Sequence, residues 1–278
     1  MSGYRVGLVV PSSNTTMETE IPAMLRRREA VDPTVRFTTH ASRVRLRQVT
    51  PDELARMNRS ALRCVAELAD AHCDVLAYAC LVAVMCEGAG AHERAERRLA
   101  RAAGRAGHDM PVVTSAGALV AGLRALGARR VALIAPYLPP LTATVAAYLA
   151  AYGVQVTDAV SLGEPDNVAV GRIPAARLVE LADRLDVTDV DAVVLSACVQ
   201  LPSLAAVPQV EARLGRPVLT AATATVHQLL TGLGVEPYVP DAGRLLAGPV
   251  AGRPIPPAPR RSAGRGRARR PRAAASPS

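Results

Sequence analysis

The sequence predicts an α/β protein of two similar lobes, each built around a parallel sheet and related to the other by a pseudo-twofold axis. Three observations support this fold class. Short β-branched runs alternate with Ala-, Leu- and Arg-rich stretches of helical period, which is typical of βαβ units. Similar strand motifs occur twice in the same order. Half of the 278 residues are hydrophobic but only 3% are aromatic, which suits tight helix-on-sheet layers of Ala, Val and Leu.

The individual elements follow from local patterns. Strands are expected at Arg5–Val10, Asp74–Ala79, Pro111–Thr114, Arg130–Ala135, Asp191–Ser196 and Pro217–Thr220. The clearest helix start is at Thr50, which can cap the helix, followed by Pro51 at the first helical position. Glu53 completes a predicted capping box, and apolar residues recur at helical spacing from Leu54 to Leu68.

The internal repeat predicts where a ligand binds. The segment Val6–Pro11 resembles 131–136, the segment ending at Cys80 resembles the one ending at Cys198, and Pro111–Thr114 resembles 217–220. A duplicated unit of this kind gives two Rossmann-like lobes. Ligand sites in open parallel sheets lie beyond the carboxyl ends of the strands. We therefore expect the active site in the cleft between the lobes, with one strand-terminal cysteine from each.

The repeat also divides the chain. Residues 1–115 together with 216–250 are expected to form lobe 1, and residues 116–215 to form lobe 2. Residues 251–278 form an Arg- and Pro-rich tail that is expected to be disordered. This tail holds eight arginines and no acid, so the net charge of +9 falls to about +1 for the rest of the chain. The charge therefore does not indicate a specific nucleic-acid partner.

Composition excludes several classes of function. The chain has no lysine, which excludes Schiff-base chemistry, pyridoxal phosphate attachment and the phosphate-binding loop. Five cysteines without paired spacing, and five scattered histidines, indicate free thiols and no metal site. No apolar run reaches the roughly 18 residues of a membrane span, and no signal peptide is recognisable. We expect a cytoplasmic protein with no membrane partner and no cofactor.

Cys80 and Cys198 are the candidate catalytic residues. Each ends an apolar strand, where a lone cysteine is most often just buried. Their equivalent places in the repeat, both facing the predicted cleft, favour a chemical role. Backbone N–H groups near a helix start are expected to lower the pKa of such a thiol.

Polar residues follow the corresponding strands. The segment Pro11–Glu18 contains Asn14 and could bind a carboxylate, although Thr15 and Glu18 also have the spacing of a plain capping box. Tyr137 follows the first strand of lobe 2, and Asn167 lies in a turn-rich loop. The apolar stretch 81–90 could cover the cleft as a lid.

Three motifs together resemble the maleate cis–trans isomerase family of the aspartate/glutamate racemase superfamily. They are PSSNTTME at 11–18, YACLVAVM at 78–85 and LSACVQ at 195–200. The resemblance covers residues 4 to 248. It implies Cys80 as the nucleophile and Cys198 as its proton-donating partner. It also implies that substrate contacts are made by Asn14, Leu81, Val82, Tyr137, Asn167, Val199 and Gln200.

The resemblance further implies conversion of maleate to fumarate, a homodimer, and a role in degrading nicotinate or a related ring. Addition of the Cys80 thiolate would make the double bond transiently single, so that it can rotate without metal or redox cofactor. We expect uncharged donors to bind both carboxylates without an arginine. Two alternatives stay open at this point: a cofactor-independent amino-acid racemase, and a two-lobed small-molecule-binding protein with inert cysteines.

Overall fold

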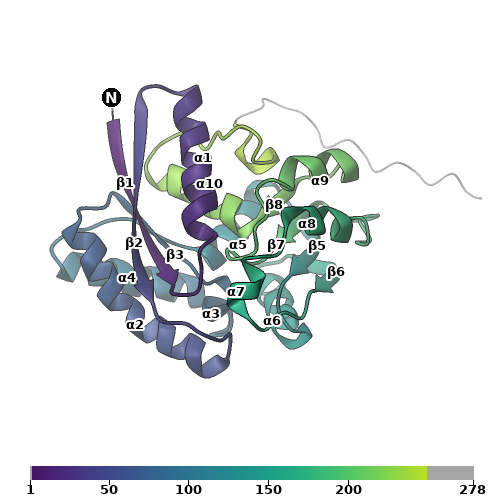
Figure 1. The fold of residues 1–278 in the computed structure, drawn as a ribbon, viewed down its shortest axis with the longest axis horizontal. Coiled ribbons are helices and arrows are strands. Elements are labelled where there is room, and N and C mark those ends of the chain that lie inside the picture. Colours follow the sequence, from purple (N-terminus) through teal and green to yellow (C-terminus); the bar gives the residue numbers. More distant parts are fainter. Residues whose placement is uncertain (1, 249–278) are drawn as a thin grey trace, which may run out of the picture.

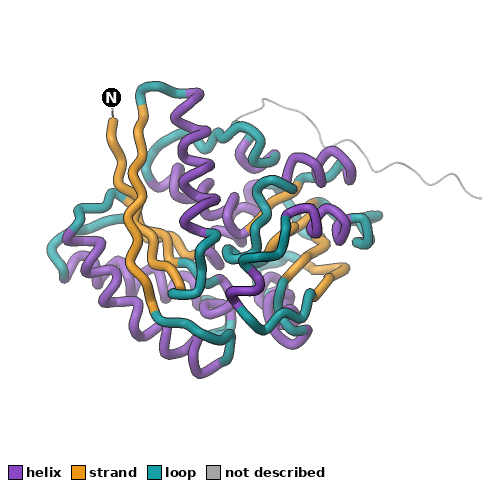
Figure 2. Tube along the Cα trace, viewed as in Figure 1, coloured by secondary structure: helices purple, strands orange, loops and turns teal. Residues whose placement is uncertain are grey.

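The computed structural model describes residues 2–248, so the predicted tail at 251–278 lies outside the described residues. The chain forms two four-stranded parallel sheets, with strand orders β2-β1-β3-β4 and β6-β5-β7-β8. Figure 1 shows the two sheets side by side, and Figure 2 shows helices around both. The identical order of corresponding strands bears out the predicted two-lobed α/β fold with parallel sheets.

The first sheet comes from the N-terminal part of the chain. Its strands are β1 (Ser2–Pro11), β2 (Val35–Val44), β3 (Val75–Tyr78) and β4 (Val112–Thr114). Helices α2 (Pro51–Asp70) and α4 (Ala91–Arg105) contact each other on one face, and α1 (Met17–Val31) contacts α10 (Ala221–Gly232) on the other. The short helix α3 (Leu81–Met85) directly follows Cys80.

The second sheet repeats this arrangement. Its strands are β5 (Arg130–Ala135), β6 (Gln155–Ser161), β7 (Ala192–Ser196) and β8 (Val218–Thr220). Around it lie α6 (Pro139–Ala150), α7 (Asn167–Val170), α8 (Ala175–Ala182) and α9 (Val207–Leu214), while α5 (Ser115–Ala125) packs against α10. A 3₁₀ turn at Arg244–Leu246 follows α10. Among the described helices, none is both long and apolar enough to cross a bilayer.

The position of strand β8 differs from the predicted division of the chain into two lobes. The rest of that division stays a prediction. Strand β8 was expected in lobe 1 with residues 216–250, but it pairs with β7 of the second sheet. The helix that follows it, α10, then returns to contact β3 and β4 of the first sheet. The chain therefore returns to the first lobe only after Thr220.

All six predicted strands are present, but β2 and β6 were not predicted. Both are edge strands whose residues are largely exposed or half-buried, so they carry few of the apolar residues that identify a buried strand. β2 contains Arg36, Thr38, His40 and Arg43, so its sequence lacks the apolar run by which a buried strand is predicted.

Helix α2 begins as predicted but its capping box is incomplete. The Thr50 hydroxyl accepts from the Glu53 amide at 3.4 Å. The Glu53 carboxylate, however, accepts from the amides of Arg47 and Gln48 at 2.7 and 2.9 Å. The Glu53 carboxylate therefore holds the loop before α2 and does not bond to the Thr50 amide, as a capping box would require.

Candidate active site

All nine predicted site residues line one cavity between the lobes. It is lined by Asn14, Cys80, Leu81, Val82, Tyr137, Asn167, Cys198, Val199 and Gln200, together with Pro11, Leu46 and Val49. These residues follow the carboxyl ends of β1, β3, β5 and β7 or lie in adjoining loops, as the parallel-sheet argument predicts. The cavity holds about 20 Å³, room for about one water molecule. The structure thus brings the nine residues together, while their roles stay predictions.

Cys80 has a strained backbone. Its φ of 104° and ψ of 78° lie in the left-handed region, which costs a non-glycine residue on the order of 1–3 kcal/mol. Strain of this kind persists only where the surroundings hold it, and it is concentrated at functional sites. The side chain is nearly enclosed, with 8% of the residue exposed.

The environment of Cys80 contradicts one expectation from the sequence. Burial raises the pKa of its thiol to about 12, although the Ala83 amide opposes this shift and Cys198 adds to it. The helix start was expected to lower the pKa below its ordinary value. In this closed site the loss of water outweighs the single amide.

Cys198 lies in a turn that its own neighbours hold. The Gln200 amide donates to its sulfur at 3.4 Å, and the Ser196 hydroxyl donates to its carbonyl at 2.8 Å. Burial raises the pKa of the thiol, while hydrogen bonds from the Tyr137 hydroxyl and from two backbone amides oppose the shift. Both thiols are therefore protonated at neutral pH in this structure.

Tyr137 is a neutral donor beside both cysteines. Burial, with further contributions from Cys198 and Cys80, holds its pKa well above the ordinary value of 10. Its hydroxyl donates to the Ala197 carbonyl at 3.1 Å. A hydroxyl that keeps its proton can turn toward a sulfur or a ligand oxygen without adding charge to the site.

Asn14 caps helix α1 as well as lining the cavity. Its Oδ1 accepts from the Met17 amide at 3.0 Å. The alternative capping box of Thr15 and Glu18 is not formed, because Thr16 occupies the N-cap position and Glu18 pairs with Arg43. Asn14 therefore serves the helix start and lines the cavity at the same time.

Gln200 joins the two lobes. Its Oε1 accepts from the amides of Thr15 and Thr16 at 3.0 and 3.4 Å, and its Nε2 donates to the Ser13 carbonyl at 3.1 Å. Gly171 makes room for this reach, since a Cβ there would lie 2.4 Å from Nε2. Across the same interface, Asn167 donates to the Ser13 hydroxyl at 2.7 Å.

Three cavity residues were missed in the sequence, and one predicted lid is absent. Pro11 was quoted only as part of a motif, and Leu46 and Val49 lie in the loop between β2 and α2. Because β2 was not predicted, nothing in the sequence connected this loop to the cleft. The stretch 81–90 instead begins with the fully buried helix α3, so its apolar residues pack in the core.

The cavity lining is uncharged. Its twelve residues include no acid, arginine or histidine, so neutral groups alone face a bound molecule there. Within residues 2–248, no group of three or more His, Cys, Asp or Glu side chains is arranged to hold a metal ion.

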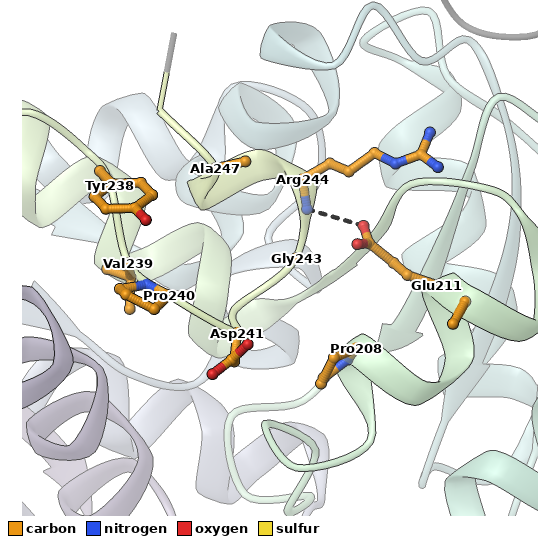
Figure 3. A pocket seen from close by; sticks show the side chains of 10 residues that line it. Pro208, Glu211, Tyr238, Val239, Pro240, Asp241, Gly243, Arg244 and Ala247 are labelled. Carbon is orange, nitrogen blue, oxygen red and sulfur yellow. Dashed lines mark hydrogen bonds between the residues drawn. The ribbon is translucent and has the colours of Figure 1, made fainter. Parts of the chain in front are cut away.

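A wider surface hollow of about 600 Å³ lies elsewhere, beside α9 and the segment 238–247. Figure 3 shows Glu211 at its edge, where Oε1 accepts from the Arg244 amide at 2.9 Å. The same oxygen accepts from the Val218 amide at 2.8 Å. This carboxylate fixes the chain after α10 to β8, and the hollow contains neither cysteine.

Known proteins share the sequence and the fold. A family model described as arylmalonate decarboxylase matches residues 6–246. The chain is 56% identical to the maleate isomerase of Geobacillus stearothermophilus over 245 residues, 88% of this chain and 98% of that protein. The maleate isomerase Iso of Pseudomonas putida S16, in a cysteine-to-alanine variant with maleate, has a TM-score of 0.88 at 48% identity. That match covers 89% of this chain and 99% of the other.

A second solved structure bears on the chemistry. It is a cysteine-to-serine variant of the Nocardia farcinica maleate cis–trans isomerase with a covalently bound succinylcysteine intermediate. Its TM-score is 0.85 at 48% identity, and the match covers 88% of this chain and 98% of that one. From these matches, over nearly the full length of each relative, this chain belongs to the maleate isomerase family of the aspartate/glutamate racemase superfamily.

Proposed function

We propose that this protein isomerises maleate to fumarate without a cofactor, through a covalent succinyl adduct on Cys80. The observation that carries the proposal is the pair of thiols, Cys80 and Cys198, at corresponding strand ends of two lobes and lining one uncharged cavity. The succinylcysteine in the Nocardia farcinica relative supports the same route.

The proposed reaction begins with addition of sulfur to the double bond. The Cys80 thiol gives its proton to water before the site closes, its sulfur then forms a bond to one olefinic carbon, and the π electrons move toward the distant carboxylate. The Cys198 thiol gives its proton to the other olefinic carbon, which leaves a succinyl group on Cys80. Rotation about the new single bond follows. Cys198 then takes the proton back, the carbon–sulfur bond breaks, and fumarate leaves with the double bond restored.

Neutral donors are proposed to bind the two carboxylates. Candidates are the side chains of Asn14, Tyr137 and Asn167 and the amides of Leu81, Val82, Val199 and Gln200. One pre-set donor in a dry site is worth about 3–4 kcal/mol at the transition state, so several can offset the repulsion between a thiolate and a dianion. A four-carbon diacid needs more room than about 20 Å³, so the cavity has to widen before maleate enters.

The uncharged lining also weighs against amino-acid racemisation. A racemase could use two opposed thiols as acid and base, but its substrate brings an ammonium group that needs an acidic partner. The cavity lining contains no acid. Maleate carries only carboxylates, so it fits the donors that are available.

One experiment separates the candidates. The full chain is incubated with maleate, and in a parallel sample with aspartate or glutamate, in deuterated buffer, and both samples are followed by proton NMR. Appearance of the fumarate signal supports the proposal. Inert maleate together with deuterium incorporation at the α-carbon of an amino acid would indicate a racemase, and inertness toward both would indicate a binding protein.

We further propose that the protein acts as a cytoplasmic homodimer in degradation of nicotinate or a related ring. Supporting the dimer, helix α6 has no charged residue, although Pro139, Pro140, Ala143, Ala147 and Ala150 are exposed. A solvent-facing helix surface usually carries charges. Sedimentation should give a dimer for the wild type and a monomer for Ala147→Arg.

A further inference from the structure

The side-chain amide of Asn58 is buried behind the Cys80 turn and makes three hydrogen bonds. Asn58 lies in α2 and is 3% exposed. Its Nδ2 donates to the Ala83 carbonyl at 2.9 Å and to Glu87 Oε1 at 2.6 Å. Its Oδ1 accepts from the Tyr78 hydroxyl.

These partners fix the orientation of the amide. The Ala83 carbonyl and the Glu87 carboxylate only accept, so the nitrogen of Asn58 has to face them. The Tyr78 hydroxyl then has to donate to Oδ1. Burial holds the pKa of Tyr78 well above its ordinary value, so it keeps the proton that it donates.

The bonds connect the two flanks of a strained residue. Tyr78 is two residues before Cys80 and Ala83 is three after it, so one side chain spans the turn that contains the φ of 104°. The Ala83 amide is also the group that favours the Cys80 thiolate most. A left-handed cysteine relaxes unless its flanks are held, and relaxation would turn the sulfur away from this amide.

We propose that Asn58 is a positioning residue, which holds Cys80 in its left-handed conformation by bridging Tyr78 and Ala83. This inference rests on the proposed role of Cys80 as the nucleophile. Asn58 is not among the residues lining the cavity, so it acts through the turn and not on the substrate. A displacement of about 1 Å can lower a rate by about 10²-fold.

The test compares three variants of the full chain. Asn58→Leu keeps the approximate volume and removes all three bonds, and Tyr78→Phe removes only the bond to the strand side. The matched control is Ser42→Ala, which removes a part-buried hydrogen bond to Glu67 in the same lobe, away from the cysteine turn.

Two readouts are taken for each variant. The first is kcat with maleate, expected to fall about 10- to 10²-fold in Asn58→Leu, less in Tyr78→Phe, and to stay within twofold of wild type in Ser42→Ala. The second is the pH profile of iodoacetamide alkylation, followed separately for the Cys80 and Cys198 peptides by mass spectrometry. In Asn58→Leu the Cys80 profile should move to higher pH while that of Cys198 stays unchanged.

Two results with Asn58→Leu would overturn the proposal. One is an equal shift of the alkylation pH profiles of Cys80 and Cys198, and the other is a kcat and a Cys80 profile that both match wild type. If Asn58→Leu does not fold, Tyr78→Phe decides by the same criteria. Alkylation needs no substrate. A wild-type protein inert toward maleate would therefore refute the proposed function, while the comparison of the two thiols still tests Asn58.

Discussion

The two cysteine turns occupy equivalent positions in the two lobes but are held by different means. The Cys80 turn is held from within its own lobe, by the bonds of Asn58 to Tyr78 and Ala83. The Cys198 turn is held by its own neighbours and from across the interface. There, Glu20 of α1 accepts from the amides of Ser203 and Leu204 at 2.6 and 2.7 Å.

The difference indicates how a duplicated fold can supply two unequal chemical roles. A nucleophile has to keep one direction of attack, and a turn anchored in a single rigid lobe does this. The proposed acid–base partner, Cys198, lies in a turn that the opposite lobe helps to hold. The pseudo-symmetry of the strands therefore does not extend to the contacts behind the thiols.

The largest expected effect on turnover follows from removing the proposed nucleophile, Cys80. Cys80→Ala should lower turnover by at least about 10³-fold, because the thiol that is proposed to add to the double bond is gone. Mass spectrometry after incubation with maleate should show no adduct. The control is Cys86→Ala, which removes an exposed thiol and should keep wild-type rates. Adduct formation on another cysteine in Cys80→Ala would reverse the assignment of roles.

Removing the partner thiol should have a smaller but still large effect. Cys198→Ser should lower kcat about 10²- to 10⁴-fold, since proton transfer to and from the adduct is impaired. The succinyl group should then accumulate on the Cys80 peptide, which quenched-reaction mass spectrometry can detect. Near-normal turnover would show that the two cysteines do not differ in the way proposed.

Substitutions of Asn14 can separate its two contacts. Asn14→Ala should lose both activity and about 1 kcal/mol of stability, because the cap on the Met17 amide is lost. Asn14→Asp keeps an accepting oxygen for the cap, but places a negative charge where a dianion is expected to bind. It should therefore lose activity even though the cap on the Met17 amide is kept. Activity retained in Asn14→Asp would mean that Asn14 serves only the helix.

The smallest expected effect is on stability, and it concerns Glu20, which accepts hydrogen bonds from the opposite lobe. Burial raises its pKa above the ordinary value of 4.5, although the Leu204 and Ser203 amides oppose the shift. The folded protein therefore binds this proton more tightly than the unfolded chain does. Its stabilising contribution is complete below about pH 4.5 and is lost as the pH rises through the folded-state pKa.

Glu20→Gln tests this directly. A neutral amide oxygen can still accept from both backbone N–H groups without the cost of a buried charge. The variant should be more stable than wild type by about 1 kcal/mol at pH 7, and the difference should vanish near pH 4. Urea unfolding at both pH values measures it. A variant less stable than wild type at pH 7 would show that the ionised carboxylate is needed to hold the Cys198 turn.

The sequence predicts the buried parts of this molecule better than its edges. Strands such as Arg130–Ala135 are found at their predicted bounds because a continuous apolar run has few alternative structures. β2 and β6 face solvent on much of their length, so polar residues conceal them. Their position is decided by pairing with β1 and β5, which a local pattern does not contain.

The same distinction applies to the candidate site. Cys80, Cys198 and their neighbours follow predicted strands, so topology alone brings them to one edge. Leu46 and Val49 follow the strand that was not predicted, and Asn58 looks like any polar residue on an amphipathic helix. Its partners at positions 78, 83 and 87 become neighbours only after α2 packs on α3. Hydrogen bonds between distant segments leave no periodic trace in a single sequence.

The reach of Gln200 has a further consequence. Its backbone N–H points at the sulfur of Cys198, while its side chain is attached to the loop of the opposite lobe. Parting of the lobes would therefore pull on the residue that hydrogen-bonds this thiol. Through this one glutamine, the turn that contains Cys198 is tied to the loop of the opposite lobe.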